Sequence, residues 1–175
     1  MTYINFIHFS SCDNKSNQTK EKVIAMSFQY EDMKKIDRKT LGKEVPLELF
    51  RSIRLIGMYQ GLPLNGKSTT ATIGRKIGES LPVHSVEGAL NLFEELKIGI
   101  PRIIEKKDNE FHIAIDECFC KGLPKQPGNK VCDLEGAILE GALEGIIKKR
   151  VRAREVKCNV NGDECCEYKV KTYEV

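Results

Sequence analysis

The sequence of 175 residues contains no tryptophan, few aromatic residues (7%) and no apolar run near the roughly 20 residues that span a bilayer. It also has little excess of either charge, because 28 Lys and Arg are balanced by 25 Asp and Glu. Nucleic-acid-binding proteins usually concentrate basic residues on one face, so we expect no direct nucleic-acid binding. The first residues lack the basic segment and the small-residue cleavage site of a signal peptide, and we therefore expect a cytoplasmic protein without a membrane span.

The length fits one domain, since domains usually contain about 100–200 residues. Residues 10–21 are polar and rich in turn-forming residues. We therefore expect residues 1–22 to form a flexible or loosely packed N-terminal extension, followed by a single domain at 23–175.

The seven cysteines are too sparse for a disulfide scaffold, and their number is odd. Six of them gather in the C-terminal part of the chain, at positions 118, 120, 132, 158, 165 and 166. In a reducing compartment such clustering favours a metal site or reactive thiols over disulfides.

The apolar pattern predicts helices before strands. Helical spacing occurs in the segments 47–59, 68–80, 86–96 and 132–149, the first of which follows Pro46. Alternation of β-branched and polar residues predicts strands at 100–104, at 110–117 and in two stretches after Val151. This order indicates an α+β fold with an antiparallel sheet packed against helices. In the last helix Ala137, Gly141 and Gly145 form a small-residue stripe, which suits close contact with the sheet or with the same helix of a second subunit.

Residues Gly61 to Ser68 match the phosphate-binding pattern G-x-x-x-x-G-K-[ST], with Lys67 for the phosphates and Asp116 as a metal-binding acid. That pattern functions directly after a buried strand, whereas residues 50–59 have helical spacing and two charges. We therefore favour a chance match, in which the segment connects two helices and Ser68 caps the second one. A nucleotide-binding protein is the less favoured alternative.

Residues 151–170 are typical of a β-hairpin, since Asn-Gly near the centre provides the positive φ that tight turns require. A three-residue loop places Cys158 opposite Cys166, whereas a two-residue loop places it opposite Cys165. The alternation of apolar residues favours Cys166 and puts both thiols in the core.

Two core thiols have an ordinary explanation, because free cysteine behaves as a small hydrophobic residue. A metal site becomes the better interpretation once Cys132, at the start of a helix, and Glu155 are included. Three thiolates and one carboxylate form a four-coordinate set that suits Zn²⁺. Glu155 lies three residues from Cys158 and therefore on the opposite face of a regular strand, so the predicted site requires a bulge or a sharp twist there.

These residues resemble the 4-vinyl reductase-like domain family in its stand-alone archaeal type. The family is a small-molecule-sensing module also found in archaeal hydrocarbon-binding proteins and in phenol-sensing transcriptional activators. The resemblance covers approximately residues 47–170 and rests on Val131-Cys132, the small-residue helix 136–145, Glu155-x-x-Cys158 and Gly162-Asp163-x-x-Cys166. It implies a structural zinc ion bound by Cys132, Glu155, Cys158 and Cys166. It also implies a homodimer with a fold similar to that of NO sensors and of TRAPP vesicle-tethering subunits.

The function implied by the resemblance is non-catalytic binding or sensing of a small hydrophobic or aromatic molecule. Candidate residues for the binding pocket are Phe50, Ile53, Leu90, Phe93 and His112, although each is more often an ordinary core or structural residue. The alternative is a reductase that acts on a vinyl or other hydrophobic substrate with an external electron donor, since the sequence has no Gly-rich dinucleotide turn.

Cys118 and Cys120 stand outside the expected ligand set. Together with Cys165 they suit a second metal site or an iron–sulfur site, but iron–sulfur clusters usually use four cysteines with closer spacing. We therefore expect Cys118 and Cys120 to be inert thiols.

Overall fold

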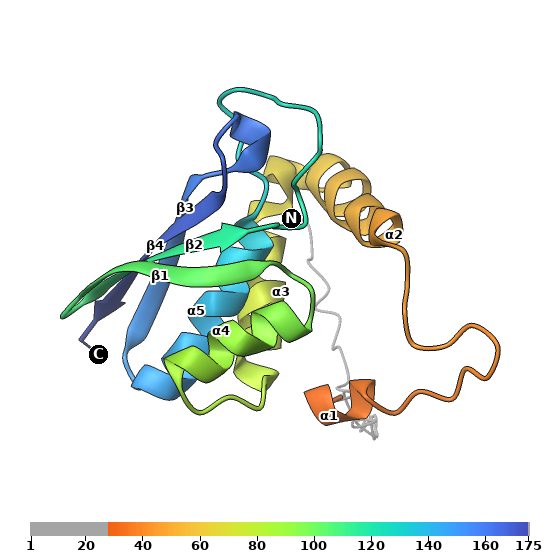
Figure 1. The fold of residues 1–175 in the computed structure, drawn as a ribbon, viewed down its shortest axis with the longest axis horizontal. Coiled ribbons are helices and arrows are strands. Elements are labelled where there is room, and N and C mark those ends of the chain that lie inside the picture. Colours follow the sequence, from red (N-terminus) through yellow and green to blue (C-terminus); the bar gives the residue numbers. More distant parts are fainter. Residues whose placement is uncertain (1–27, 175) are drawn as a thin grey trace, which may run out of the picture.

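A computed structural model describes residues 28–174 of the chain, so the expected extension at 1–22 lies outside the described residues (Figure 1). The helical elements are α1 (Tyr30–Met33), α2 (Leu47–Arg51), the π-helix η1 (Ser52–Gln60), the 3-10 turn η2 (Pro63–Gly66), α3 (Lys67–Ser80), α4 (Val86–Glu95), α5 (Asp133–Ile147) and the 3-10 turn η3 (Asn159–Asn161). The strands are β1 (Ile100–Lys107), β2 (Glu110–Asp116), β3 (Arg150–Lys157) and β4 (Cys166–Tyr173). Within residues 28–174, no helix has both the length and the apolar character needed to cross a membrane.

The four strands form one antiparallel sheet in the order β1-β2-β4-β3, so that two hairpins lie side by side. Alternation along β2 buries Ile113 and Ile115 against the helices and leaves His112 and Asp116 partly exposed. The pairing of β2 with β4 sets Ile115 beside Cys166. The expected α+β fold, with an antiparallel sheet packed against helices, is confirmed.

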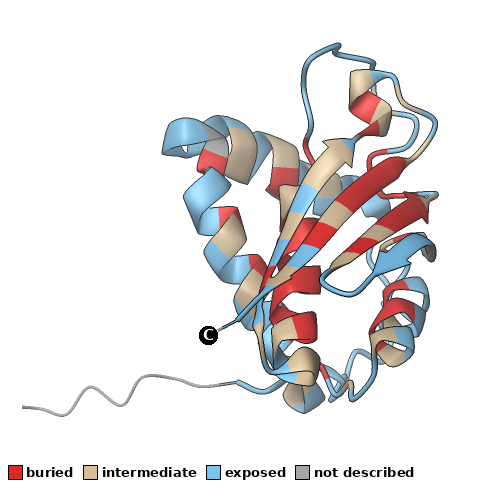
Figure 2. Ribbon diagram, turned by 90° about the vertical axis from the view of Figure 1, so that its left-hand side faces the viewer, coloured by how far each residue is buried: buried red, intermediate tan, exposed pale blue. Residues whose placement is uncertain are grey.

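Helix α5 is buried because it lies between β3 and α3, and buried residues gather where the sheet meets the helices (Figure 2). A Cβ atom on Gly141 would lie 2.2 Å from the carbonyl oxygen of Arg75 in α3, and one on Gly74 would lie 2.5 Å from the Cβ atom of Ala137. The small-residue stripe therefore serves a helix pair within the chain. It no longer supports the expectation of a homodimer through this helix.

The helix expected at 47–59 is present, but its second half is a π-helix instead of an α-helix. Pro46 occupies the N-cap position, where its fixed φ and missing N–H cost the helix nothing. Helical structure thus occupies the segment directly before Gly61, where a phosphate-binding loop requires a buried strand.

The connection to α3 also differs from the expectation. The prediction that Ser68 caps the second helix is wrong, because α3 begins at Lys67 and its N-cap is Gly66, with a φ of +64°. A Cβ atom on Gly66 would lie 2.6 Å from the carbonyl oxygen of Met58, so this turn requires glycine. Lys67 is exposed, and Asp116 pairs with Arg102 at 2.9 Å. The match to the phosphate-binding pattern therefore lacks the structure that gives the pattern its function.

Candidate metal centre

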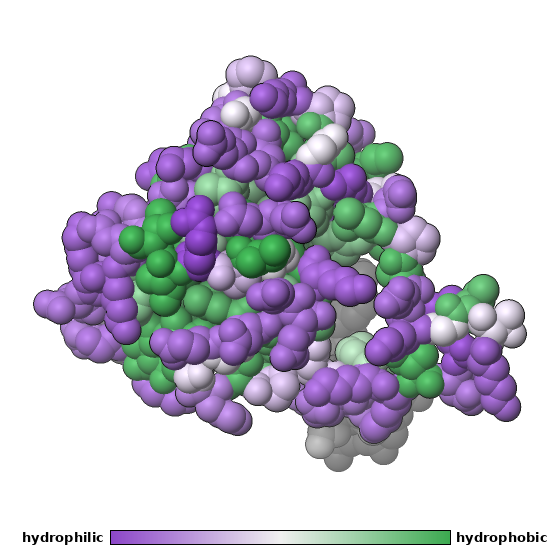
Figure 3. All heavy atoms as spheres, in the orientation of Figure 1, coloured by the Kyte–Doolittle hydropathy of each residue, from purple (hydrophilic) through white to green (hydrophobic). Residues whose placement is uncertain are grey.

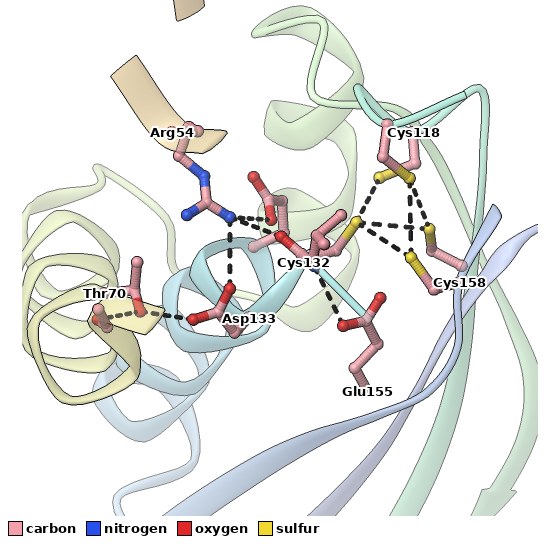
Figure 4. Close-up of polar contacts among 12 residues, drawn as sticks. Arg54, Thr70, Cys118, Cys132, Asp133, Glu155 and Cys158 are labelled. Atoms are coloured by element: carbon pink, nitrogen blue, oxygen red, sulfur yellow. Dashed lines mark hydrogen bonds and ion pairs between the residues drawn. The ribbon is translucent and has the colours of Figure 1, made fainter. Parts of the chain in front are cut away.

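Five buried thiols converge beside the ends of β2 and β3, and they come from separate segments of the chain (Figure 4). This thiol cluster consists of Cys118 and Cys120 in the turn after β2, Cys132 directly before α5, Cys158 after β3 and Cys166 at the start of β4. Each of the five is at most 1% exposed. The three cysteines of the expected ligand set are therefore brought together.

The spacing of the sulfur atoms is that of a metal site. Cys132 Sγ lies 3.6 Å from Cys166 Sγ and 3.9 Å from Cys158 Sγ. Cys120 Sγ lies 3.4 Å from Cys166 Sγ, and Cys118 Sγ lies 3.6 Å from Cys132 Sγ. A tetrahedral zinc ion with Zn–S bonds of about 2.3 Å holds its sulfur ligands about 3.8 Å apart. The cluster thus has the separations that such an ion requires.

Glu155 reaches the same place through an irregularity in β3. The ladder between β3 and β4 shifts its register between Glu155 and Lys157, which is the bulge that the sequence required. Glu155 Oε2 accepts a hydrogen bond from the backbone N–H of Cys132 at 3.1 Å, while Oε1 is buried without a partner among residues 28–174. The donor atoms of Cys132, Glu155, Cys158 and Cys166 all lie within 4.8 Å of one another. An unpaired buried carboxylate oxygen beside three thiols fits a metal ligand.

The electrostatics of the cluster point to a cation. Burial, together with the neighbouring Cys158, raises the pKa of Glu155 to about 9. The pKa of Cys132 is raised well above its ordinary value, because the adjacent thiols, Cys118 first, and burial all favour its protonated form. Several thiolates and a carboxylate cannot ionise together in such a site without a positive charge. A Zn²⁺ ion supplies that charge and deprotonates the thiols that bind it.

Hydrogen bonds from the surrounding residues position the ligands. Tyr168 Oη donates to the carbonyl oxygen of Cys132 at 2.7 Å, and burial raises the pKa of this phenol well above its ordinary value. The Asp163 carboxylate accepts a hydrogen bond from the backbone N–H of Cys158 at 2.8 Å. Contacts of this kind orient metal ligands before the ion binds.

A buried ion pair lies beside the cluster at the start of α5. Arg54 of η1 is 2% exposed, donates to the carbonyl oxygen of Val131 at 2.9 Å and lies 3.3 Å from Glu135 Oε2. Burial raises the pKa of Glu135 to about 7, although Arg54 opposes this shift. The guanidinium group also lies over the ring of Phe119, 5.4 Å from its centroid. Arg54 therefore fastens η1 to the turn after β2 and to the start of α5.

The residues expected to form a ligand pocket are not gathered in one place. Leu90 and Phe93 in α4 belong to the hydrophobic core. Phe50 and Ile53 lie on α2 and η1 and are 37% and 54% exposed. His112 lies among three glutamates, with its Nε2 atom 3.0 Å from Glu110 Oε1.

A cavity of about 160 Å³ lies between η1 and the loop that precedes α5. Its lining is mostly apolar and consists of Leu55, Tyr59, Gln60, Leu123, Pro124, Gln126, Val131 and Val160. Val131 directly precedes Cys132, and Val160 follows Cys158 by two residues. The backbone N–H of Gln126 donates to the carbonyl oxygen of Val160 at 2.6 Å, so the loop is tied to the segment that carries Cys158. The cavity therefore shares its walls with the candidate metal centre.

Sequence reasoning missed the place of Cys118 and Cys120, and it wrongly grouped them with Cys165, which lies outside the thiol cluster. The turn that carries Cys118 and Cys120 reaches the cluster because Ile115 pairs with Cys166. That pairing depends on the strand order, which the spacing of cysteines along the chain does not reveal. The local signal was only the Cys-x-Cys pattern directly after a buried strand.

Comparison with known proteins identifies the C-terminal part of the chain. The family model of the 4-vinyl reductase domain matches residues 111–172, the segment that contains Glu155 and every residue of the thiol cluster. An uncharacterized protein of Methanocaldococcus jannaschii is 29% identical over 140 residues, which cover 76% of this chain and 79% of the relative. A second one is 29% identical over 151 residues, which cover 86% and 81%. The similarity thus extends well beyond the matched domain.

Solved structures show the same fold at low sequence identity. A vinyl-4-reductase family protein from M. jannaschii superposes with a TM-score of 0.59 at 22% identity, over 82% of this chain and 88% of that one. A trafficking protein particle complex subunit 3 from Naegleria fowleri, covalently bound to palmitic acid, gives 0.58 at 16%, over 73% and 93%. The phenol-responsive sensory domain of the transcription activator PoxR, solved with phenol, gives 0.53 at 14%, over 73% and 75%. The expected similarity to TRAPP-type subunits is confirmed.

Proposed function

Residues 111–172 belong to the 4-vinyl reductase domain family, and on this basis we propose that the chain is a cytoplasmic, zinc-containing module that binds a small apolar or aromatic molecule and has no catalytic role. The observation that carries the proposal is the convergence of Cys132, Cys158 and Cys166 with the unpaired Oε1 atom of Glu155. The cavity beside these residues is the second support.

In this proposal Cys132, Glu155, Cys158 and Cys166 bind one Zn²⁺ ion through three sulfur atoms and one oxygen atom. Four protein ligands leave no open coordination position, which is typical of a structural zinc site and not of a catalytic one. When bound, the ion cross-links the start of α5 to β3 and β4. The chain's own residues then hold the walls of the adjacent cavity at a fixed separation.

The size of the cavity supports a single aromatic ring as the ligand. An apolar protein cavity of about 150 Å³ accommodates benzene, and the cavity here has a volume of about 160 Å³. Tyr59, Gln60 and Gln126 supply polar groups at its margin, which suits a ring that carries a hydroxyl group. The similar fold of the PoxR sensory domain, whose solved structure holds phenol, supports the same class of ligand.

Thermal unfolding in the presence of phenol or toluene tests the binding part of the proposal. A ligand that binds only the folded state should raise the melting temperature of the wild-type protein. Leu55→Phe enlarges a side chain in the cavity wall and should abolish this shift. Ile56→Phe is the matched control, because Ile56 lies on the same helix and is 63% exposed. Equal shifts in both variants would reject this cavity as the binding site.

A homodimer is also part of the proposal. Leu49, Ile53 and Ile56 are 50%, 54% and 63% exposed on α2 and η1, and hydrophobic residues reach the surface on this side of the molecule (Figure 3). Apolar helix faces of this kind are typical of subunit interfaces. Native mass spectrometry of the full chain reports the number of subunits, and a monomer at micromolar concentration would remove this part of the proposal.

A further inference from the structure

The thiol cluster and Glu155 together offer six donor groups, whereas one zinc ion binds four. The proposed ligand set leaves Cys118 and Cys120 without a role, although they are 1% and 0% exposed. Both thiols contact that set, since Cys118 Sγ lies 3.6 Å from Cys132 Sγ and Cys120 Sγ lies 3.4 Å from Cys166 Sγ. Their positions are those of metal ligands and not of isolated core residues.

Cys118, Cys120, Cys132 and Cys166 form a second four-donor cage, whose sulfur atoms all lie within 4.8 Å of one another. The first cage is the ligand set proposed above, and it meets the same criterion. The two cages share one edge, which joins Cys132 Sγ and Cys166 Sγ and is 3.6 Å long. Two tetrahedra with a common edge are the geometry of two metal ions bridged by two thiolates.

We propose that this chain binds two zinc ions, the second held by Cys118 and Cys120 together with Cys132 and Cys166, which bridge the pair. This inference rests on the proposed function, because the first ion is the zinc ion of that proposal. A thiolate sulfur has enough lone pairs to bind two ions at once. The second ion also allows Cys118 and Cys120 to ionise without a change in net charge, since two thiolates balance one Zn²⁺.

The turn that carries the Cys-x-Cys pair is held firmly in place. Glu117, which begins the turn, has a φ of +50°, a conformation that is costly for a residue other than glycine and persists where the surroundings enforce it. Arg51 of α2 donates from Nε to the carbonyl oxygen of Phe119 and from Nη2 to that of Lys121, both at 2.7 Å. The fold therefore fixes this pair of thiols against the bridging residues before any ion binds.

Two other arrangements are less consistent with the structure. An iron–sulfur cluster keeps its thiolates farther apart, because its own iron and sulfide atoms lie between them. A single ion enclosed by Cys120, Cys132, Cys158 and Cys166 is the main competitor, since Cys120 Sγ lies 4.0 Å from Cys158 Sγ. That contact lengthens in the two-ion site, where the two residues bind different ions, and a single ion also leaves Cys118 unused.

The number of zinc ions per chain separates these arrangements. Elemental analysis and native mass spectrometry of the full chain, purified with zinc and then exchanged into zinc-free buffer, should report two ions. Cys118→Ser/Cys120→Ser should retain one ion, because the first ligand set is intact. Cys165→Ser is the matched control, since Cys165 adjoins Cys166 but lies outside the cluster, and it should retain two. One ion in the wild-type protein would overturn this inference and leave the proposed function standing, whereas no metal would overturn both.

Cadmium-113 NMR of the cadmium-substituted wild-type protein tests the inference without any variant, because the chemical shift depends on the number of sulfur donors. Two resonances are expected, one for four thiolates and one for three thiolates with a carboxylate. Cys118→Ser/Cys120→Ser should lose the first resonance and keep the second. A single all-thiolate resonance in the wild-type protein would identify the one-ion arrangement and contradict the inference.

Discussion

Glu155 Oε2 accepts a hydrogen bond from the backbone N–H of Cys132 at 3.1 Å, and this contact joins β3 to the start of α5. The other oxygen of the same carboxylate is buried and unpaired among the described residues, close to the three thiols of the proposed ligand set (Figure 4). One side chain thus positions one ligand and supplies another.

Replacement of this carboxylate should weaken zinc binding. Glu155→Gln keeps the size of the side chain but removes its negative charge, and we expect the zinc affinity to fall by at least about 10-fold to 100-fold, the range seen when groups that only orient ligands are lost. Competition with a chromophoric chelator measures the affinity. Glu164→Gln is the control, because Glu164 is exposed and belongs to neither cage. Equal affinities in the two variants would show that the Glu155 carboxylate does not bind the ion.

The phenol of Tyr168 should contribute to stability through one buried hydrogen bond. Tyr168→Phe leaves the carbonyl oxygen of Cys132 without its donor at 2.7 Å, and an unsatisfied buried acceptor costs about 1–3 kcal/mol. Urea unfolding measures the difference in the free energy of unfolding. Tyr173→Phe removes a hydroxyl group from a residue that is 47% exposed and should change the stability little. A loss of the same size in both variants would reject this assignment.

The contact between α3 and α5 should tolerate no side chain at Gly141. Gly141→Ala places a Cβ atom 2.2 Å from the carbonyl oxygen of Arg75, and we expect a loss of about 2 kcal/mol or more from overpacking. Gly145→Ala, one turn later in the same helix, meets no atom within 4 Å among the described residues. It should raise the stability by up to about 1 kcal/mol, because alanine favours a helix over glycine. Thermal unfolding of the pair measures both effects, and a neutral Gly141→Ala would contradict the packing described here.

The buried carboxyl group of Glu135 should make stability depend on pH. Arg54 from η1, Asp133 from α5 and Cys120 from the turn after β2 act on it, yet burial raises its pKa to about 7 from an ordinary 4.5. Because the folded protein holds this proton more tightly than the unfolded chain, the stabilisation is complete below about pH 4.5 and is lost as the pH rises through 7. The loss amounts to at most about 3 kcal/mol.

Glu135→Gln isolates this effect, since the amide stays neutral at every pH. The wild-type protein should lose stability relative to Glu135→Gln between pH 4.5 and 7, and the difference should level off above that range. Urea unfolding of both proteins at each pH, with equal zinc content, measures it. Parallel profiles would show that the Glu135 carboxyl group titrates alike in the folded and unfolded chains.

The sequence predicts much of the fold because its patterns are local. Hydrophobic periodicity places the helices and strands, and the Asn-Gly turn indicates the hairpin of β3 and β4. The requirement for a bulge at Glu155 follows from strand alternation alone, and the register shift beside that residue confirms it. The loop was wrong in detail, since the connection between Lys157 and Cys166 includes η3 and is longer than the expected three residues.

The remainder depends on contacts between distant segments. Cys118 and Cys120 enter the cluster through the pairing of β2 with β4, and the small-residue stripe of α5 packs against α3. The same stripe would suit a subunit interface equally well, so no pattern along the chain distinguishes the two uses. The π-helical form of η1 likewise accompanies Arg54, whose partners lie far away in the sequence.

Thermal unfolding of the full chain before and after zinc removal, with the zinc content measured in each sample, tests the zinc cross-link most directly. We expect the purified protein to contain zinc, and a chelator to lower the melting temperature by about 10 °C or more, as follows from a loss of roughly 4 kcal/mol in a domain of this size. Added zinc should restore the original value. A protein that contains no zinc, or that melts at the same temperature after its zinc has been removed, would contradict the account.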